Sequence, residues 1–171
     1  MNRRTVLALT ATTLLCAGVV FNASPAWSQQ KSLKEQLVGT WTFVSSTGKL
    51  PDGSPLWGTS PKGLLIFTEN GRFSSHIVRS DRKKFASNNR LQGTADDNKA
   101  TAQATISGFG TYSVNEAAKT YTLRYEGSSY PNQEGTESIR PAMLTGDELK
   151  VTNPSPTIGG SPTELLYRRA K

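Results

Sequence analysis

His76 is the one histidine of this chain, and it stands in the segment "RFSSHIV" beside two serines. An imidazole can act as a general base near neutral pH, so His76 is a weak candidate catalytic residue if it faces a cavity. In an extended segment Ser74 and His76 share one side at a spacing of roughly 6–7 Å, which argues against direct nucleophile–base contact. The sequence favours a half-exposed histidine without a catalytic role.

A second set of chemically useful side chains lies in the tyrosine-rich later part of the chain. Tyr121, Leu123 and Tyr125 alternate in "TYTLRYEGSS", and Tyr112 lies on the preceding segment of the same kind. Facing inward, these side chains would line a cavity with apolar surface and hydroxyl groups that orient a ligand. Ordinary core packing of the tyrosines is the open alternative.

Arg140 stands in "ESIRPAML" and completes this candidate ligand-binding set. An arginine inside a protein needs a carboxylate partner, such as Glu126 or Glu137, or else an anionic ligand. The open alternative is that Arg140 points to solvent.

Other site chemistries find little support in the residues. With one cysteine, Cys16, and one histidine, the chain lacks the ligands of a transition-metal site, and no metal or cofactor is expected. The densest basic run, "RSDRKK" at 79–84, includes Asp81 and no aromatic residue, so nucleic acid is not an expected partner. The formal net charge of +7 is therefore assigned mainly to solvated surface.

Residues 1–28 have the pattern of a cleavable signal peptide. Arg3 and Arg4 precede an apolar block, and the small residues Ala26 and Ser28 mark a cleavage site after Ser28. The sequence therefore predicts a periplasmic or secreted protein with no stable membrane insertion after cleavage. The general secretory route is favoured for its export, and the twin-arginine route stays an open alternative. An uncleaved anchor is the alternative.

The remaining chain reads as strands joined by turns. A short polar segment, 29–36, precedes a domain predicted at 37–171, whose first strand begins at Leu37. Glu69-Asn70-Gly71 predicts a hairpin with a primed turn, and residues 80–103 are either a loop or a loop holding a short helix near 96–104. About eight closely spaced strands predict an all-β, antiparallel up-and-down β-barrel.

The first strand contains Gly39-Thr40-Trp41, which resembles the Gly-x-Trp start of the lipocalins and related calycin barrels. The resemblance implies that Trp41 plugs the closed end of a barrel and that an arginine of the last strand packs across the indole. Gly39 would then lie where the backbone bends into the closed end. Counting by two from Leu165 and Tyr167 selects Arg169 as that arginine.

Longer segments extend the resemblance over nearly all of residues 36–170. "GTWTFVSSTGKLPDGSP", "GLLIFTENGRFSSHIVRSDR", "FGTYSVNEAAKTYTLRYEGSSYPNQEGTESIRP" and "GDELKVTNPSP" resemble the bacterial and fungal lipocalin-like domain family. The resemblance implies the barrel fold but little about chemistry.

Three functions are compatible with this sequence. The favoured one is an exported barrel that binds a small hydrophobic or amphipathic molecule in its cavity. The first alternative is a cavity enzyme of the isomerase or cyclase type that uses tyrosine, arginine and His76. The second is an envelope or stress protein with a filled barrel. Because no catalytic constellation stands out, an enzyme is the less favoured class.

Overall fold

The computed structural model describes residues 31–171, which form one compact unit. The signal peptide predicted at 1–28 lies outside the described residues. Among the helices of residues 31–171, none is both long and apolar enough to cross a membrane.

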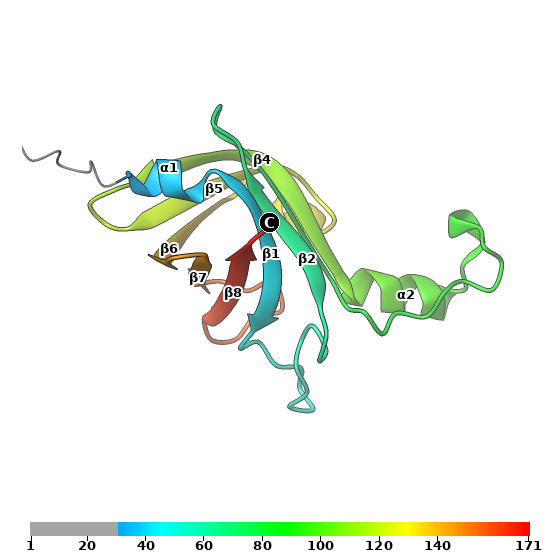
Figure 1. The fold of residues 1–171 in the computed structure, drawn as a ribbon. Coiled ribbons are helices and arrows are strands. Elements are labelled where there is room, and N and C mark those ends of the chain that lie inside the picture. The colour runs from blue at the N-terminus through cyan, green and yellow to red at the C-terminus, as the bar shows by residue number, and fades with distance from the viewer. Residues whose placement is uncertain (1–30) are drawn as a thin grey trace, which may run out of the picture. The chain divides into compact units, whose positions relative to one another are not determined.

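Eight antiparallel strands close into an up-and-down barrel, which confirms the fold class expected from the sequence (Figure 1). Each strand pairs with the next in the chain, and the last pairs with the first. The strands are β1 (Gly39–Ser46), β2 (Lys62–Phe67), β3 (Arg72–Val78), β4 (Thr105–Asn115), β5 (Thr120–Ser128), β6 (Glu137–Thr145), β7 (Glu148–Asn153) and β8 (Thr163–Arg169).

The two ends of the barrel differ in their connections. Helix α1 (Leu33–Leu37) lies at the end where short turns join β2 to β3, β4 to β5 and β6 to β7. Longer loops at the other end include η1 (Arg90–Gln92), α2 (Ala95–Gln103) and η2 (Pro131–Gln133). Helix α2 buries no side chain and projects away from the barrel (Figure 1). We call these the closed end and the open end.

Two local predictions from the sequence are wrong. Leu37 is the last residue of α1 rather than the first of a strand, because Ser32 and Glu35 form a capping box that starts a helix at Leu33. The β2–β3 turn is not a primed turn, since Gly71 has a φ of +82° but Asn70 does not have a positive φ. The connection from Thr68 to Arg72 is long enough to close with one left-handed residue.

The core runs along the barrel interior and is rich in aromatic rings. Phe67 makes edge contacts with both Tyr112 and Tyr121, at centroid distances of 4.7 and 5.2 Å. Phe43 packs against Tyr167, and Phe73 against Tyr125, both at 5.3 Å. Ala142 of β6 and Leu149 and Val151 of β7 join these rings in one hydrophobic cluster inside the barrel, as the alternation in the sequence predicts.

Candidate functional site

The closed end is organised around Trp41, which is fully buried on β1. Its indole Nε1 donates a hydrogen bond of 2.7 Å to the Leu37 carbonyl at the end of α1. The guanidinium carbon of Arg169 lies 4.2 Å from the Trp41 ring centroid, and the two residues are direct partners in the β1–β8 register. The helix, the ring and the last strand are thus joined at one point.

Arg169 also satisfies backbone groups that α1 leaves open. Its Nη1 and Nη2 donate to the carbonyls of Val38 and Gln36, at 3.1 and 2.7 Å. Gly39 has a φ of +123°, and a side chain there would meet Arg169 Nη1 at 3.3 Å. The backbone geometry therefore favours glycine at this position, and a Cβ there would also press against the arginine side chain.

The first turn of α1 is held from a distant hairpin. Glu116, in the β4–β5 turn, accepts hydrogen bonds from the backbone N–H groups of Leu33 and Lys34, at 2.7 and 3.0 Å. These N–H groups have no partner within the helix, and their bonds hold the pKa of Glu116 below its ordinary value. The hydrogen bonds made by Trp41, Arg169 and Glu116 therefore fix α1 across the closed end of the barrel.

Arg140 occupies the barrel interior and is only 8% exposed. Its Nη2 donates to the Tyr125 hydroxyl at 3.0 Å, and its Nε donates to Ser138 Oγ at 3.1 Å. Since Tyr125 and Ser138 lie toward the open end of β5 and β6, the guanidinium points in that direction. Nη1 carries no hydrogen bond to any residue of the described range.

The carboxylates expected to pair with Arg140 are engaged elsewhere. Glu126 forms two hydrogen bonds with Arg72, at 2.7 and 2.8 Å, on the outer surface. Glu137 pairs with Arg124 at 3.2 Å, also on the surface. No salt bridge joins Arg140 to a residue within 31–171, and residues 1–30 contain no Asp or Glu. The buried charge is left without a carboxylate of its own chain.

A cavity of about 60 Å³ adjoins Arg140 at the open half of the barrel. Tyr125 and Arg140 provide polar groups on one side, and Asn153 and Thr163 provide them from β7 and β8. Trp57, nearly buried in the β1–β2 loop, covers this space together with Leu56. Further apolar lining comes from Ile77, Ile106, Leu165 and Tyr167.

A model of the lipocalin-like domain matches residues 38–165 of the chain. The chain belongs to the lipocalin-like domain family. This confirms the resemblance drawn from the sequence.

Two solved structures illustrate the wider similarity of this lipocalin-like domain. A protein described as REP1-NXSQ fatty acid transporter is 11% identical, with a TM-score of 0.37, and the match covers 80% of this chain and 98% of that one. Wild-type fluorescent protein UnaG is 15% identical, with a TM-score of 0.34 and coverage of 80% and 98%. No curated protein matches the chain.

The candidate ligand-binding residues of the lipocalin-like domain separate into two groups. Tyr125 and Arg140 line the cavity, whereas Tyr112, Tyr121 and Leu123 are buried in the core outside its lining. The Tyr112 hydroxyl donates to the Thr68 carbonyl at 2.9 Å, near the closed end. The structure thus brings together one tyrosine and the arginine, not the continuous wall that the alternation suggested.

Tyr121 nevertheless bears on the electrostatics around Arg140. The two residues are cross-strand partners, and the buried Tyr121 hydroxyl lies near the guanidinium without a hydrogen bond from any described residue. Burial raises the pKa of Tyr121 to about 12, with the Arg140 charge opposing this rise. Burial likewise raises the pKa of Tyr167. Both phenols stay neutral at physiological pH.

His76 lies on the outer face of the barrel, so it cannot act inside the cavity. The expectation that Ser74 and His76 are too far apart for contact is wrong, because Ser74 Oγ lies 2.9 Å from His76 Nε2. The spacing along a strand separates the backbones, but these two side chains lean toward each other. The pair is exposed, and within residues 31–171 no carboxylate orients the imidazole.

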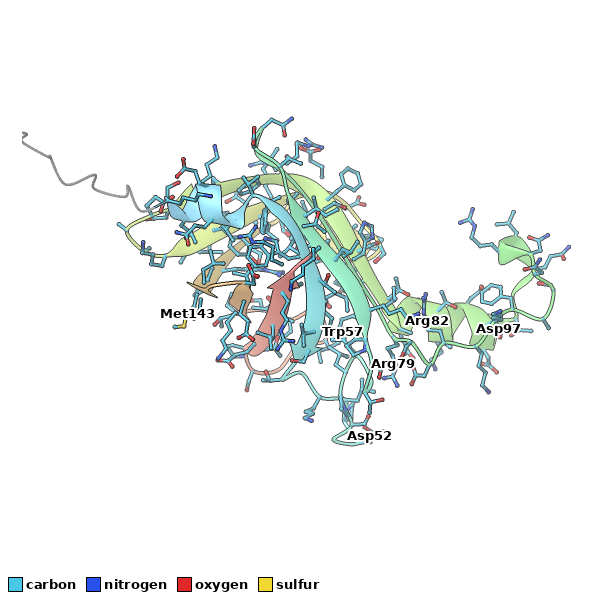
Figure 2. The ribbon with its side chains drawn as sticks, viewed as in Figure 1. Asp52, Trp57, Arg79, Arg82, Asp97 and Met143 are labelled. Atoms are coloured by element: carbon cyan, nitrogen blue, oxygen red, sulfur yellow. The ribbon has the colours of Figure 1, made fainter. Side chains whose placement is uncertain are left out.

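Sequence reasoning missed the part played by the β1–β2 loop. Leu56 lines both the Arg140 cavity and a separate surface groove of about 890 Å³. Asp52 and Arg79 lie on the side of this groove near the loop, and Arg82 and Asp97 lie toward α2 (Figure 2). Arg79 Nη1 donates to the Leu56 carbonyl at 3.2 Å, which ties the loop to β3. The apolar pair Leu56-Trp57 within a Pro/Gly-rich segment was the available signal.

Proposed function

We propose that this lipocalin-like barrel binds a small, partly apolar molecule whose anionic group pairs with Arg140. The observation that carries the proposal is a buried guanidinium with a free Nη1 and no carboxylate partner. A buried charge without a partner is costly, and a bidentate carboxylate matches the fork of an arginine. Trp57, Ile77 and Leu165 supply apolar surface for the rest of the ligand.

Calorimetric titration of the purified protein with straight-chain carboxylates, from propionate to decanoate, tests this proposal. Arg140→Met removes the charge but keeps an unbranched apolar chain, and we expect it to weaken binding at least about 30-fold, since hydrogen bonds to charged groups are strong. Tyr125→Phe should weaken binding about 10-fold, less than Arg140→Met, because it removes one hydrogen bond to the carboxylate but keeps the guanidinium. His76→Ala, on the outer face, is the matched control and should bind as the wild type does. Equal affinity of Arg140→Met and wild type would refute the proposal.

A filled barrel without a ligand is the second candidate, and one observation favours it. Tyr121, Leu123 and Tyr167 are almost fully buried, and the cavity has room for only about two water molecules at roughly 30 Å³ each. If no carboxylate of the series binds to the wild type, this candidate replaces the first.

We also propose that the protein is exported, with residues 1–28 removed as a signal peptide. The support is the sequence of that segment, with its basic start, apolar block and small residues before Gln29. Intact-mass analysis of protein isolated from the native envelope should give a chain that begins at or near Gln29. A mass that retains residues 1–28 would contradict export by cleavage.

A further inference from the structure

Asn153 has unused hydrogen-bonding capacity in the same cavity as Arg140. Its Oδ1 is enclosed and accepts no hydrogen bond from the described residues, while its side chain lines the cavity. An enclosed carbonyl oxygen without a hydrogen-bond donor is unfavourable, so a donor supplied by a ligand would favour binding. Among residues 31–171, the other enclosed side-chain atom of this kind is the Tyr121 hydroxyl, which does not line the cavity.

Asn153 and Arg140 lie on the adjacent strands β7 and β6 and line the same cavity. The β6–β7 register runs to the pair Ala142–Val151, and Arg140 and Asn153 each lie two residues beyond that pair, with the same inward parity. Asn153 also pairs with Thr163 on β8, another buried polar residue of the lining. A ligand held by Arg140 therefore has a carboxamide beside its anionic group rather than an apolar wall.

The size of the cavity restricts what can stand between these two residues. About 60 Å³ accommodates a carboxylate and one neighbouring polar group but not a bulky head. A hydroxyl both donates and accepts, so it satisfies a carboxamide whichever end the amide presents. An alkyl chain alone would leave the amide unpaired.

We propose that the cavity selects a 2-hydroxy carboxylate: Arg140 and Tyr125 hold the carboxylate, and Asn153 hydrogen-bonds to the adjacent hydroxyl. This inference rests on the proposed function and names the ligand class of that same site. Asn153 is then a specificity-determining residue, which distinguishes hydroxy acids from the parent fatty acids. A site built to pair with a hydroxyl rejects the analogue that lacks it, since its polar group is then left unpaired.

Hexanoate and 2-hydroxyhexanoate form a matched probe pair that differs by the hydroxyl alone. We expect the wild type to bind 2-hydroxyhexanoate at least about 10-fold more tightly than hexanoate, which corresponds to about 1.4 kcal/mol. Asn153→Ala, which removes the carboxamide without adding bulk to the cavity wall, should bring this ratio close to one while hexanoate still binds. Thr152→Val is the neighbouring control and should keep the wild-type ratio.

A second measurement does not depend on any variant. In ¹⁵N-labelled wild type, the side-chain amide resonance of Asn153 should shift on addition of 2-hydroxyhexanoate and stay in place with hexanoate. Equal affinities for the two acids, or a ratio unchanged by Asn153→Ala, would overturn the hydroxy-acid inference and leave Arg140 as a general carboxylate site. Failure of both acids to bind would refute the proposed function itself.

Discussion

The closed end and the Arg140 cavity both set an arginine against aromatic side chains inside one barrel, but they differ in how completely its hydrogen bonds are used. Arg169 donates to two backbone carbonyls and stacks on Trp41, whose own N–H is also bonded. Arg140 has one nitrogen without a hydrogen bond and no carboxylate partner among the described residues, and Asn153 of the same cavity has an unpaired Oδ1. An arginine whose N–H groups are paired within the protein stabilises the fold. A buried arginine with an unpaired nitrogen can instead bind a ligand.

The connections between the strands also differ between the two ends of the barrel. Short turns and α1 surround the closed end, where Glu116 reaches back to cap the helix. Long loops surround the open end, and one of them brings Trp57 over the cavity. Substitutions at the closed end should therefore reduce stability, whereas substitutions in the cavity should reduce binding more than stability. The following predictions test this contrast in order of decreasing effect.

The largest effect is expected for Trp41→Ala. The substitution removes a fully buried indole together with the contacts of Arg169 and the hydrogen bond to Leu37. We expect the free energy of unfolding to fall by about 3–5 kcal/mol, the usual range for a buried large aromatic residue. Urea titration measures it, with the exposed Ile139→Ala as a control that should change stability by less than about 0.5 kcal/mol. A similar small loss for Trp41→Ala would mean that the closed end is not structural.

Alkaline pH provides the next largest effect and probes the tyrosine beside Arg140. The pKa of Tyr121 is raised by burial from 10 to about 12, so its contribution to stability is complete below pH 10 and is lost as pH rises toward 12. Over these two pH units the loss amounts to about 3 kcal/mol at about 1.4 kcal/mol per unit. Urea titrations between pH 9 and 12 should show a steeper decline for the wild type than for Tyr121→Phe. Parallel curves would show that Tyr121 is not held neutral by burial.

The barrel itself was predictable because its signals are local. Alternating apolar residues, short turns and the Gly-x-Trp start specify strands and their order, and parity along β8 selects Arg169, the observed register partner of Trp41. The short helix near 96–104 was one of two open possibilities, and α2 spans Ala95–Gln103. Strand alternation placed Tyr121 and Tyr125 on one face of their strand, and both are buried in the structure.

The cavity was less predictable because it depends on contacts between distant segments. Whether Glu126 and Glu137 pair with Arg140 or with surface arginines is decided by which face of each strand they occupy and by the neighbouring strand. The burial of Trp57 depends on how a long loop folds over the open end, which no periodic pattern specifies. Asn153 belongs to no sequence motif. Only the folded barrel shows that its Oδ1 is enclosed without a hydrogen bond.

A smaller effect is expected for Arg169→Ala at the closed end. The change removes stacking on Trp41 and two hydrogen bonds to backbone carbonyls, but leaves the indole in place. We expect a loss of about 1–2 kcal/mol in urea titrations, from lost cation–π and packing interactions. Arg168→Ala, which removes an exposed neighbour on the same strand, is the matched control and should cost less than about 0.5 kcal/mol. Equal losses for the two variants would show that the stacked position has no special role.

The smallest effect on stability is expected for Arg140→Met, although Arg140 is more buried than Arg169. Removing the guanidinium relieves the cost of a buried charge that has no carboxylate partner, and methionine retains most of the apolar contact. The change also removes two hydrogen bonds, to Tyr125 and Ser138, which offsets part of that gain. The net change in the free energy of unfolding should therefore stay within about 1 kcal/mol of zero in urea titrations without ligand. A loss larger than that of Arg169→Ala would contradict the comparison, since it would make Arg140 a structural residue like its counterpart at the closed end.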